Sequence, residues 1–260
     1  MPRVGPVGRG RGRRYSCESA STVFFRGFQP AGDMTLSSKT ISGKAVELTA
    51  SDGHRLDAYE ASPAGPACGG IVVIQEIFGV NRHIRAVVDQ YARAGFRSIA
   101  PALFDRVQRG ADVPYGEAPQ GIAIMQQIKV EDALLDVAAA AAALAPAGKV
   151  GVVGYCWGGT LAYLAAARLP IAAAVSYYGG GTTRYLAEKP RAPVMYHYGE
   201  RDAHIPPAAV EAVRAAHPEG RFYVYPAGHG FNCTDRVNFD APSAALAFER
   251  SLSFLHEYLR

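Results

Sequence analysis

The segment 151–160, GVVGYCWGGT, constrains the fold more than any other part of the chain. Small and β-branched residues over 149–153 predict a buried strand, and 160–168 has the pattern of a helix. The glycines on both sides of Cys156 allow a tight strand-to-helix turn that lifts this side chain clear of the sheet. Because the N-terminus of a helix favours negative charge, this turn suits a thiolate or an oxyanion. The segment therefore predicts a nucleophilic cysteine.

The rest of the chain alternates strand and helix patterns after an initial hairpin around Asp52-Gly53. This order predicts a doubly wound, mostly parallel sheet with an antiparallel N-terminal edge. A polar loop at 105–119 is expected to lie over the sheet and to line a pocket. We expect strands at 44–50, 55–61, 70–74, 97–100, 149–153, 171–178, 192–198 and 221–225, and helices at 83–94, 120–144, 160–168 and 241–258.

The 260 residues divide into two parts by composition. Residues 34–260 have no linker-like stretch and are expected to form a single α/β domain. Residues 1–33 are rich in arginine and glycine, lack periodicity and are predicted to be disordered. Three interpretations stay open for this tail: a translated upstream region with the natural start at Met34, a flexible extension, or a targeting or nucleic-acid arm.

Charge and composition argue against several function classes. The net charge of +4 comes entirely from the arginines of residues 1–33, so the remaining residues are neutral overall and we expect no nucleic-acid partner. The sequence has no run of 18 apolar residues, so we predict no membrane span. The cysteines at 17, 68, 156 and 233 fit neither a zinc site nor a redox pair, and we expect no metal, no cofactor and no disulfide framework. A cytoplasmic location is the resulting prediction, and the oligomeric state stays open.

Two residues downstream of Cys156 are suited to activate it. A thiol near its reference pKa needs a base, and the base needs an acid to orient it. Asp202 follows a predicted strand in HYGERDAHIP, and His229 lies in a glycine-rich turn, YPAGHGFN, after the last strand. In a parallel sheet, residues that follow the carboxyl ends of strands converge, so we expect a Cys-His-Asp triad. The alternatives are a turn residue at 202, an ordinary loop histidine at 229, or His204 as the base.

Glu76 follows the predicted strand 70–74 and is expected to lie beside the nucleophile. The backbone N–H groups of Ile77 and Trp157 are candidates for an oxyanion hole. A carboxylate near a buried thiol tends to have a raised pKa and can exchange a proton with that thiol. The alternative is a surface glutamate.

These motifs together resemble the dienelactone hydrolase family of α/β-hydrolases. QEIFGVN, APALFDR, VGYCWGG, YYGGG, HYGERDAHIP and AGHGF occur in family order and span residues 40–258. The resemblance implies the α/β-hydrolase fold, the triad Cys156, Asp202 and His229, and Glu76 as an internal glutamate. It also implies a resting thiol turned toward Glu76, released as a thiolate that forms a thioester with a lactone or ester.

The resemblance extends less clearly to the substrate site. Family members hold a substrate carboxylate with two arginines. Arg106 lies at the expected position of the first, whereas Asn232 and Cys233 replace the second and Arg236 lies farther on. Three aromatic residues could line the pocket or simply belong to the core: Phe78, Tyr115 and Phe231.

The sequence thus predicts a hydrolase for a small activated carboxylic ester or lactone. The alternatives are a broad-specificity esterase or thioesterase and a non-catalytic protein that retains the fold.

Overall fold

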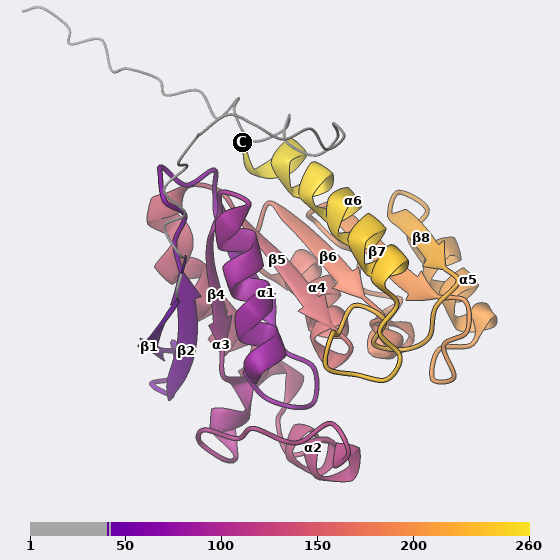
Figure 1. The fold of residues 1–260 in the computed structure, drawn as a ribbon, viewed down its shortest axis with the longest axis horizontal. Helices are drawn as coiled ribbons and strands as arrows, with labels where there is room; N and C mark the ends of the chain where they lie inside the picture. The colour runs from indigo at the N-terminus through magenta and orange to yellow at the C-terminus, as the bar shows by residue number, and fades with distance from the viewer. Residues whose placement is uncertain (1–40, 42) are drawn as a thin grey trace, which may run out of the picture. The chain divides into compact units, whose positions relative to one another are not determined.

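The computed structural model describes residue 41 and residues 43–260, and Figure 1 gives their arrangement. The predictions for the tail 1–33 lie outside these residues. The boundary at residue 34 stays a prediction.

The described residues contain one eight-stranded sheet in the order β1-β2-β4-β3-β5-β6-β7-β8. The β1–β2 and β2–β4 pairs are antiparallel and all other neighbours are parallel, which confirms the predicted fold class. The strands are β1 (Lys44–Thr49), β2 (Arg55–Ala61), β3 (Gly70–Ile74), β4 (Arg97–Pro101), β5 (Val150–Tyr155), β6 (Ala173–Tyr177), β7 (Val194–Gly199) and β8 (Arg221–Tyr225).

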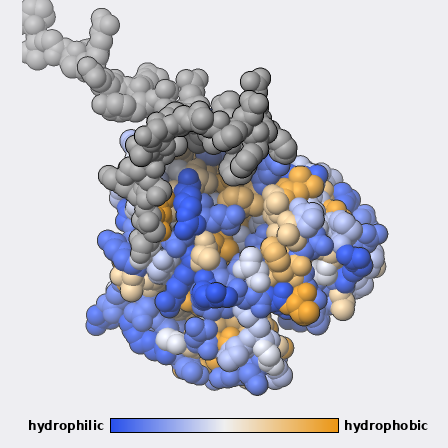
Figure 2. Space-filling view, in the orientation of Figure 1, coloured by the Kyte–Doolittle hydropathy of each residue, from blue (hydrophilic) through white to orange (hydrophobic). Residues whose placement is uncertain are grey.

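Helices cover both faces of this sheet. In Figure 1, α1 and α6 lie in front of the strands and α3 and α4 lie behind them. The hydrophilic colouring of Figure 2 dominates the front face, with smaller apolar areas between. The helices are α1 (Arg82–Arg93), α2 (Ala118–Met125), α3 (Val130–Leu144), α4 (Trp157–Arg168), α5 (Pro207–Ala216) and α6 (Ala241–Leu259), with 3₁₀ helices η1 (Leu103–Arg106), η2 (Ala145–Ala147) and η3 (Gly180–Tyr185).

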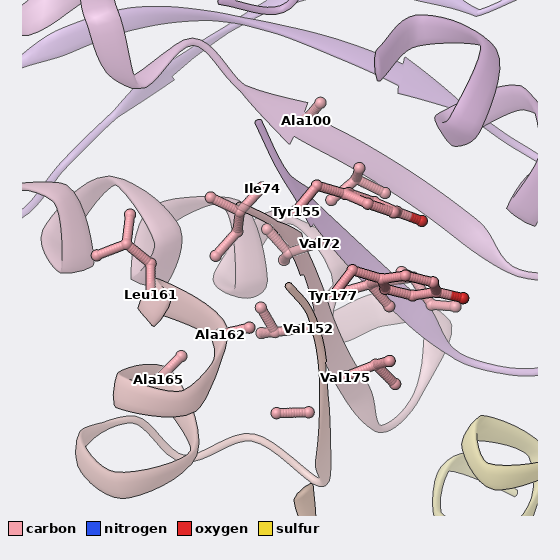
Figure 3. Packing of buried hydrophobic residues seen from close by; sticks show 14 of the residues in the cluster. Val72, Ile74, Ala100, Val152, Tyr155, Leu161, Ala162, Ala165, Val175 and Tyr177 are labelled. Atoms are coloured by element: carbon pink, nitrogen blue, oxygen red, sulfur yellow. The ribbon is translucent and has the colours of Figure 1, made fainter. Parts of the chain in front are cut away.

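The central strands are apolar because both of their faces are covered. Every residue of β3 is buried, as expected for a parallel strand between two helical layers. In Figure 3, the rings of Tyr155 and Tyr177 lie on one side of the sheet, and Leu161 and Ala165 of α4 lie on the other. This double burial fixes the strand ends that carry the candidate site.

One predicted helix, 120–144, is wrong in its extent. The structure has two helices there, α2 and α3, because Lys129 adopts an extended backbone (φ −70°, ψ 144°) that interrupts the helical path. No glycine or proline marks this break. Ile124 and Ile128 are both buried beside it, so packing determines the interruption rather than helix propensity. The expected loop 105–119 also differs, since η1 and α2 extend into its two ends.

Candidate active site

Cys156 occupies the turn between β5 and α4. Its backbone has φ 56° and ψ −115°, a left-handed φ that is unfavourable for a residue with a side chain. A Cβ atom at Gly154 would overlap the carbonyl of Gly158, so only glycine permits this turn. Such backbone strain costs on the order of 1–3 kcal/mol and is found mainly at functional sites.

The same turn is packed against the end of β3. A Cβ atom at Gly158 would lie 2.5 Å from the carbonyl oxygen of Ile74, so the first turn of α4 approaches β3 closely. The strands β3 and β5 are parallel neighbours, with Ile74 opposite Gly154. The residues that follow β3 therefore lie beside Cys156.

The structure brings the three predicted triad residues together. Nε2 of His229 lies 3.1 Å from Sγ of Cys156, and Nδ1 of His229 lies 2.7 Å from Oδ2 of Asp202. The other oxygen of Asp202 accepts hydrogen bonds from the backbone N–H groups of His204 and Ile205. The carboxylate of Asp202 is thus fixed from both sides, and it orients the imidazole toward the sulfur.

The surroundings of His229 favour its protonated form. Burial of the ring opposes the charge, but the hydrogen bonds to Asp202 and Cys156 outweigh it and raise the pKa of His229 to about 10. The imidazole thus contacts the sulfur on one side and, on the other, a carboxylate that favours its protonated form.

His204 is not in the position of the base. Only its backbone N–H binds Asp202, and its ring packs edge-on against the ring of His229 at 5.1 Å between centroids.

Glu76 is buried beside the triad and forms an ion pair with Arg236. Nη1 of Arg236 lies 3.1 Å from Oε1 of Glu76, whose side chain is 1% exposed. Burial raises the pKa of Glu76, and Arg236 and then His229 partly counteract this effect. The surface alternative for Glu76 is therefore wrong.

The expected resting arrangement of the thiol differs from the one observed. Sγ of Cys156 is directed at His229, and no hydrogen bond joins Cys156 and Glu76 in the described part of the chain. The partner of Glu76 is Arg236 instead.

The two candidate oxyanion donors lie at the ends of adjacent strands. Trp157 is the first residue of α4, whose first N–H groups have no acceptor within the helix. The N–H of Ile77 has no partner among the turn and loop hydrogen bonds of the described residues. The carbonyl of Ile77 is in close contact with Gly121 of α2, where a Cβ atom would overlap it. The segment after β3 is therefore held between the elbow and α2.

Arg106 is paired with carboxylates of the protein itself. Its guanidinium binds both carboxylate oxygens of Asp136 at 2.7 Å and Asp52 at 2.8 Å. Asp136 is fully buried, so this cation neutralises an internal charge.

The three predicted aromatic residues lie in different surroundings. Phe78 and Tyr115 pack edge to face at 4.6 Å between centroids, and the guanidinium of Arg236 lies over both rings. Phe231 is fully buried and packs against Tyr178, which also contacts the ring of His229. Phe231 is thus a core residue that supports the triad histidine.

Two residues of the site were missed. Arg236 lies beyond the position at which a second substrate-binding arginine is expected. The loop after His229 nevertheless brings it into contact with Glu76. Tyr178 has φ 40° directly after β6 and packs against His229. Its sequence signal is the YYGGG motif.

The cysteines outside the elbow have different states. Cys233 is a buried free thiol, whereas Cys68 is disulfide-bonded. In the described residues, no three His, Cys, Asp or Glu side chains are arranged to hold a metal ion. No described helix combines the length and apolar character needed to cross a membrane.

Comparison with known proteins identifies the family to which this chain belongs. The model of the dienelactone hydrolase family matches residues 56–259. A carboxymethylenebutenolidase of Pseudomonas putida is 35% identical over 225 residues, which cover 82% of this chain and 95% of that protein. Carboxymethylenebutenolidase 1 of Cupriavidus pinatubonensis is 32% identical and covers 81% and 95%, respectively.

Solved structures agree on the fold. A crystal structure from Klebsiella pneumoniae subsp. pneumoniae has a TM-score of 0.73 at 30% identity and covers 84% of this chain and all of that chain. The dienelactone hydrolase of Anabaena variabilis has a TM-score of 0.63 at 17% identity, covers 85% and 99%, respectively, and supports the fold alone.

Proposed function

Since the chain belongs to the dienelactone hydrolase family and is a carboxylic ester hydrolase, we propose that Cys156 is its nucleophile. In this proposal Cys156, His229 and Asp202 cleave a small activated ester or lactone through a thioester. The observation that carries the proposal is the continuous line of contacts from Sγ through the imidazole to the Asp202 carboxylate.

The first half of the reaction forms a bond between Sγ and the carbonyl carbon. The thiolate of Cys156 attacks, and the carbonyl π electrons move to oxygen, where the N–H groups of Ile77 and Trp157 stabilise the oxyanion. When the oxyanion collapses, the carbon–oxygen bond to the leaving group breaks. The imidazolium of His229 gives its proton to the leaving oxygen, and a thioester on Cys156 remains.

The second half releases the acid. The now neutral His229 accepts a proton from water, and the resulting hydroxide attacks the thioester carbonyl. The tetrahedral intermediate collapses, the carbon–sulfur bond breaks, and the carboxylic acid and the thiolate are released. Asp202 stabilises the imidazolium in both halves without taking the proton itself.

The substrate class follows from the nucleophile and from the charge beside it. A thiolate expels stabilised leaving groups such as enolates or aryloxides more readily than alkoxides. Arg236 is a partly buried cation, 18% exposed, that lies next to Glu76 and in the same cluster as Phe78. We therefore assign to Arg236, rather than to Arg106, the binding of a carboxylate on the acyl part of the substrate.

A substrate panel with nucleophile variants tests the proposal. Wild-type protein is expected to hydrolyse a 4-nitrophenyl ester and an enol lactone at least about 100-fold faster than the ethyl ester of the same acid, because a poor leaving group raises the barrier by several kcal/mol. Cys156→Ala is expected to abolish turnover and to retain the fold. Comparable rates for the two esters, or an active Cys156→Ala variant, would refute the mechanism.

The two alternatives give different results on the same panel. A broad esterase or thioesterase would hydrolyse short acyl thioesters and aryl esters but leave enol lactones intact. A non-catalytic protein would turn over none of the substrates, although it would bind them. Mass spectrometry of the acid-quenched protein with a slow ester adds a direct criterion, since the proposal expects an acyl adduct on Cys156.

A further inference from the structure

The hydroxyl group of Tyr115 accepts hydrogen bonds from Asn81 and Cys233. Nδ2 of Asn81 lies 3.0 Å from it, and Sγ of Cys233 lies 3.1 Å from it. The amide of Asn81 cannot turn, because its Oδ1 caps α1 by accepting from the N–H of Ile84. A hydroxyl has two acceptor lone pairs and one proton. Both lone pairs of Tyr115 are thus occupied, and its proton requires a third group.

Glu76 offers the acceptor that the proton of Tyr115 requires. Oε1 accepts from Arg236, but Oε2 is buried and has no partner of regular hydrogen-bond geometry among the described residues. A buried carboxylate oxygen without a donor is costly. Tyr115 belongs to the same cluster, since the guanidinium of Arg236 lies 5.9 Å from the centre of its ring. A hydrogen bond from Tyr115 also lowers the pKa of Glu76, in opposition to burial and together with Arg236.

We propose that Tyr115 is a positioning residue that donates its hydroxyl proton to Oε2 of Glu76, and that Asn81 and Cys233 direct that proton there. Tyr115 then holds the internal glutamate rather than the substrate. Its part in turnover rests on the proposed function, in which Glu76 acts beside Cys156.

The expected effect of removing this donor has a definite sign. The titratable and charged groups that face Glu76 are Arg236, His229, Tyr115, Tyr178 and Cys233. A carboxylate that loses a donor becomes easier to protonate, so its pKa rises. In Tyr115→Phe, Glu76 should therefore take up its proton about one pH unit higher than in the wild type.

The direct test follows Glu76 by carbon-13 NMR of side-chain-labelled glutamate, in the whole protein. The signal is assigned by its disappearance in Glu76→Gln. Tyr115→Phe keeps the ring that packs on Phe78, and its midpoint is expected to move upward by about one unit. Tyr196→Phe is the matched control, because that buried hydroxyl in β7 has no hydrogen-bond partner within residues 43–260. An unchanged midpoint in Tyr115→Phe, or an equal shift in Tyr196→Phe, overturns the proposal.

Variants at Cys233 test the directing role without touching the tyrosine. Cys233→Ala removes one of the two donors and is expected to raise the same midpoint by a smaller amount. Cys233→Ser restores a donor and should return the midpoint toward the wild-type value. If both variants behave alike, Cys233 does not direct the hydroxyl.

The pH profile of kcat/KM separates this inference from the proposed function. If Tyr115→Phe moves both the NMR midpoint and the acidic limb upward, both proposals are supported. A shifted midpoint with an unmoved acidic limb supports the position of Tyr115 but contradicts a catalytic part for Glu76. If Cys156→Ala is inactive and neither quantity moves in Tyr115→Phe, only the inference on Tyr115 fails.

Discussion

Arg236 and Glu76 lie 160 positions apart in the sequence, and Nη1 of the arginine is 3.1 Å from Oε1 of the glutamate. This pair neutralises a carboxylate that is almost fully enclosed beside the nucleophile. A buried charge without its partner is strongly destabilising, whereas the intact pair is nearly balanced by its desolvation cost. The pair is therefore sensitive to the loss of either member.

The first prediction concerns this pair. Arg236→Ala leaves Glu76 as an unpaired buried carboxylate, so the free energy of unfolding at pH 8 should fall by about 3 kcal/mol. The loss should be smaller at pH 5, because Glu76 can then take up a proton. Urea denaturation at both pH values measures the effect. Adding Glu76→Gln to Arg236→Ala should recover part of the stability, and equal losses with and without Glu76→Gln would contradict this account.

The contribution of His229 to the free energy of unfolding should decrease as the pH rises. The loss of stability in Arg236→Ala, in contrast, should increase. Its folded-state pKa, about 10, lies above the unfolded value of 6.5. The stability that the charged ring contributes is therefore complete below pH 6.5 and is lost as the pH rises toward 10. The difference in free energy of unfolding between wild type and His229→Gln should shrink steadily over that range. A difference that grows with pH would show that the ring is not charged in the folded protein.

The contact between Gly121 of α2 and the carbonyl of Ile77 is expected to affect kcat. A Cβ atom at Gly121 would overlap the carbonyl of Ile77, so Gly121→Ala should displace the peptide that carries one oxyanion donor. Loss of one such donor costs about 100- to 1000-fold in kcat, and we expect a drop of at least about tenfold from its displacement. Gly116→Ala is the control, since open space surrounds that position. Equal kcat values for the two variants would refute this role of α2.

Arg106 is expected to act on stability and not on substrate binding. Arg106→Ala leaves the fully buried Asp136 unpaired and should lower the free energy of unfolding by about 3 kcal/mol. The ratio of kcat/KM between a carboxylate-bearing ester and its neutral analogue should stay unchanged. A selective loss for the charged ester would restore Arg106 as a substrate ligand.

Local pattern and strand order were sufficient to predict much of this molecule. The β2, β3 and β8 strands begin and end at the expected residues, because alternation and apolar runs are local signals. The convergence of Cys156, Asp202 and His229 follows from a general rule, namely that the carboxyl ends of parallel strands share one edge.

The missed features depend on the path of the chain in space. The break between α2 and α3 has no glycine or proline, and it follows from the burial of Ile124 and Ile128. Arg236 reaches Glu76 through a loop whose course no periodicity describes. The ion pair of Arg106 with Asp136 was not predicted, because the carboxylate lies on a different element thirty positions away.

The left-handed conformation at position 156 accompanies close backbone contacts that Gly154 and Gly158 permit, and none of these contacts involves the sulfur atom. The backbone conformation of this turn is therefore independent of the atom that acts as the nucleophile. A hydroxyl could replace the thiol on an unaltered backbone, so exchange of the attacking atom is open to evolution and to enzyme engineers, whereas exchange of the surrounding glycines is not.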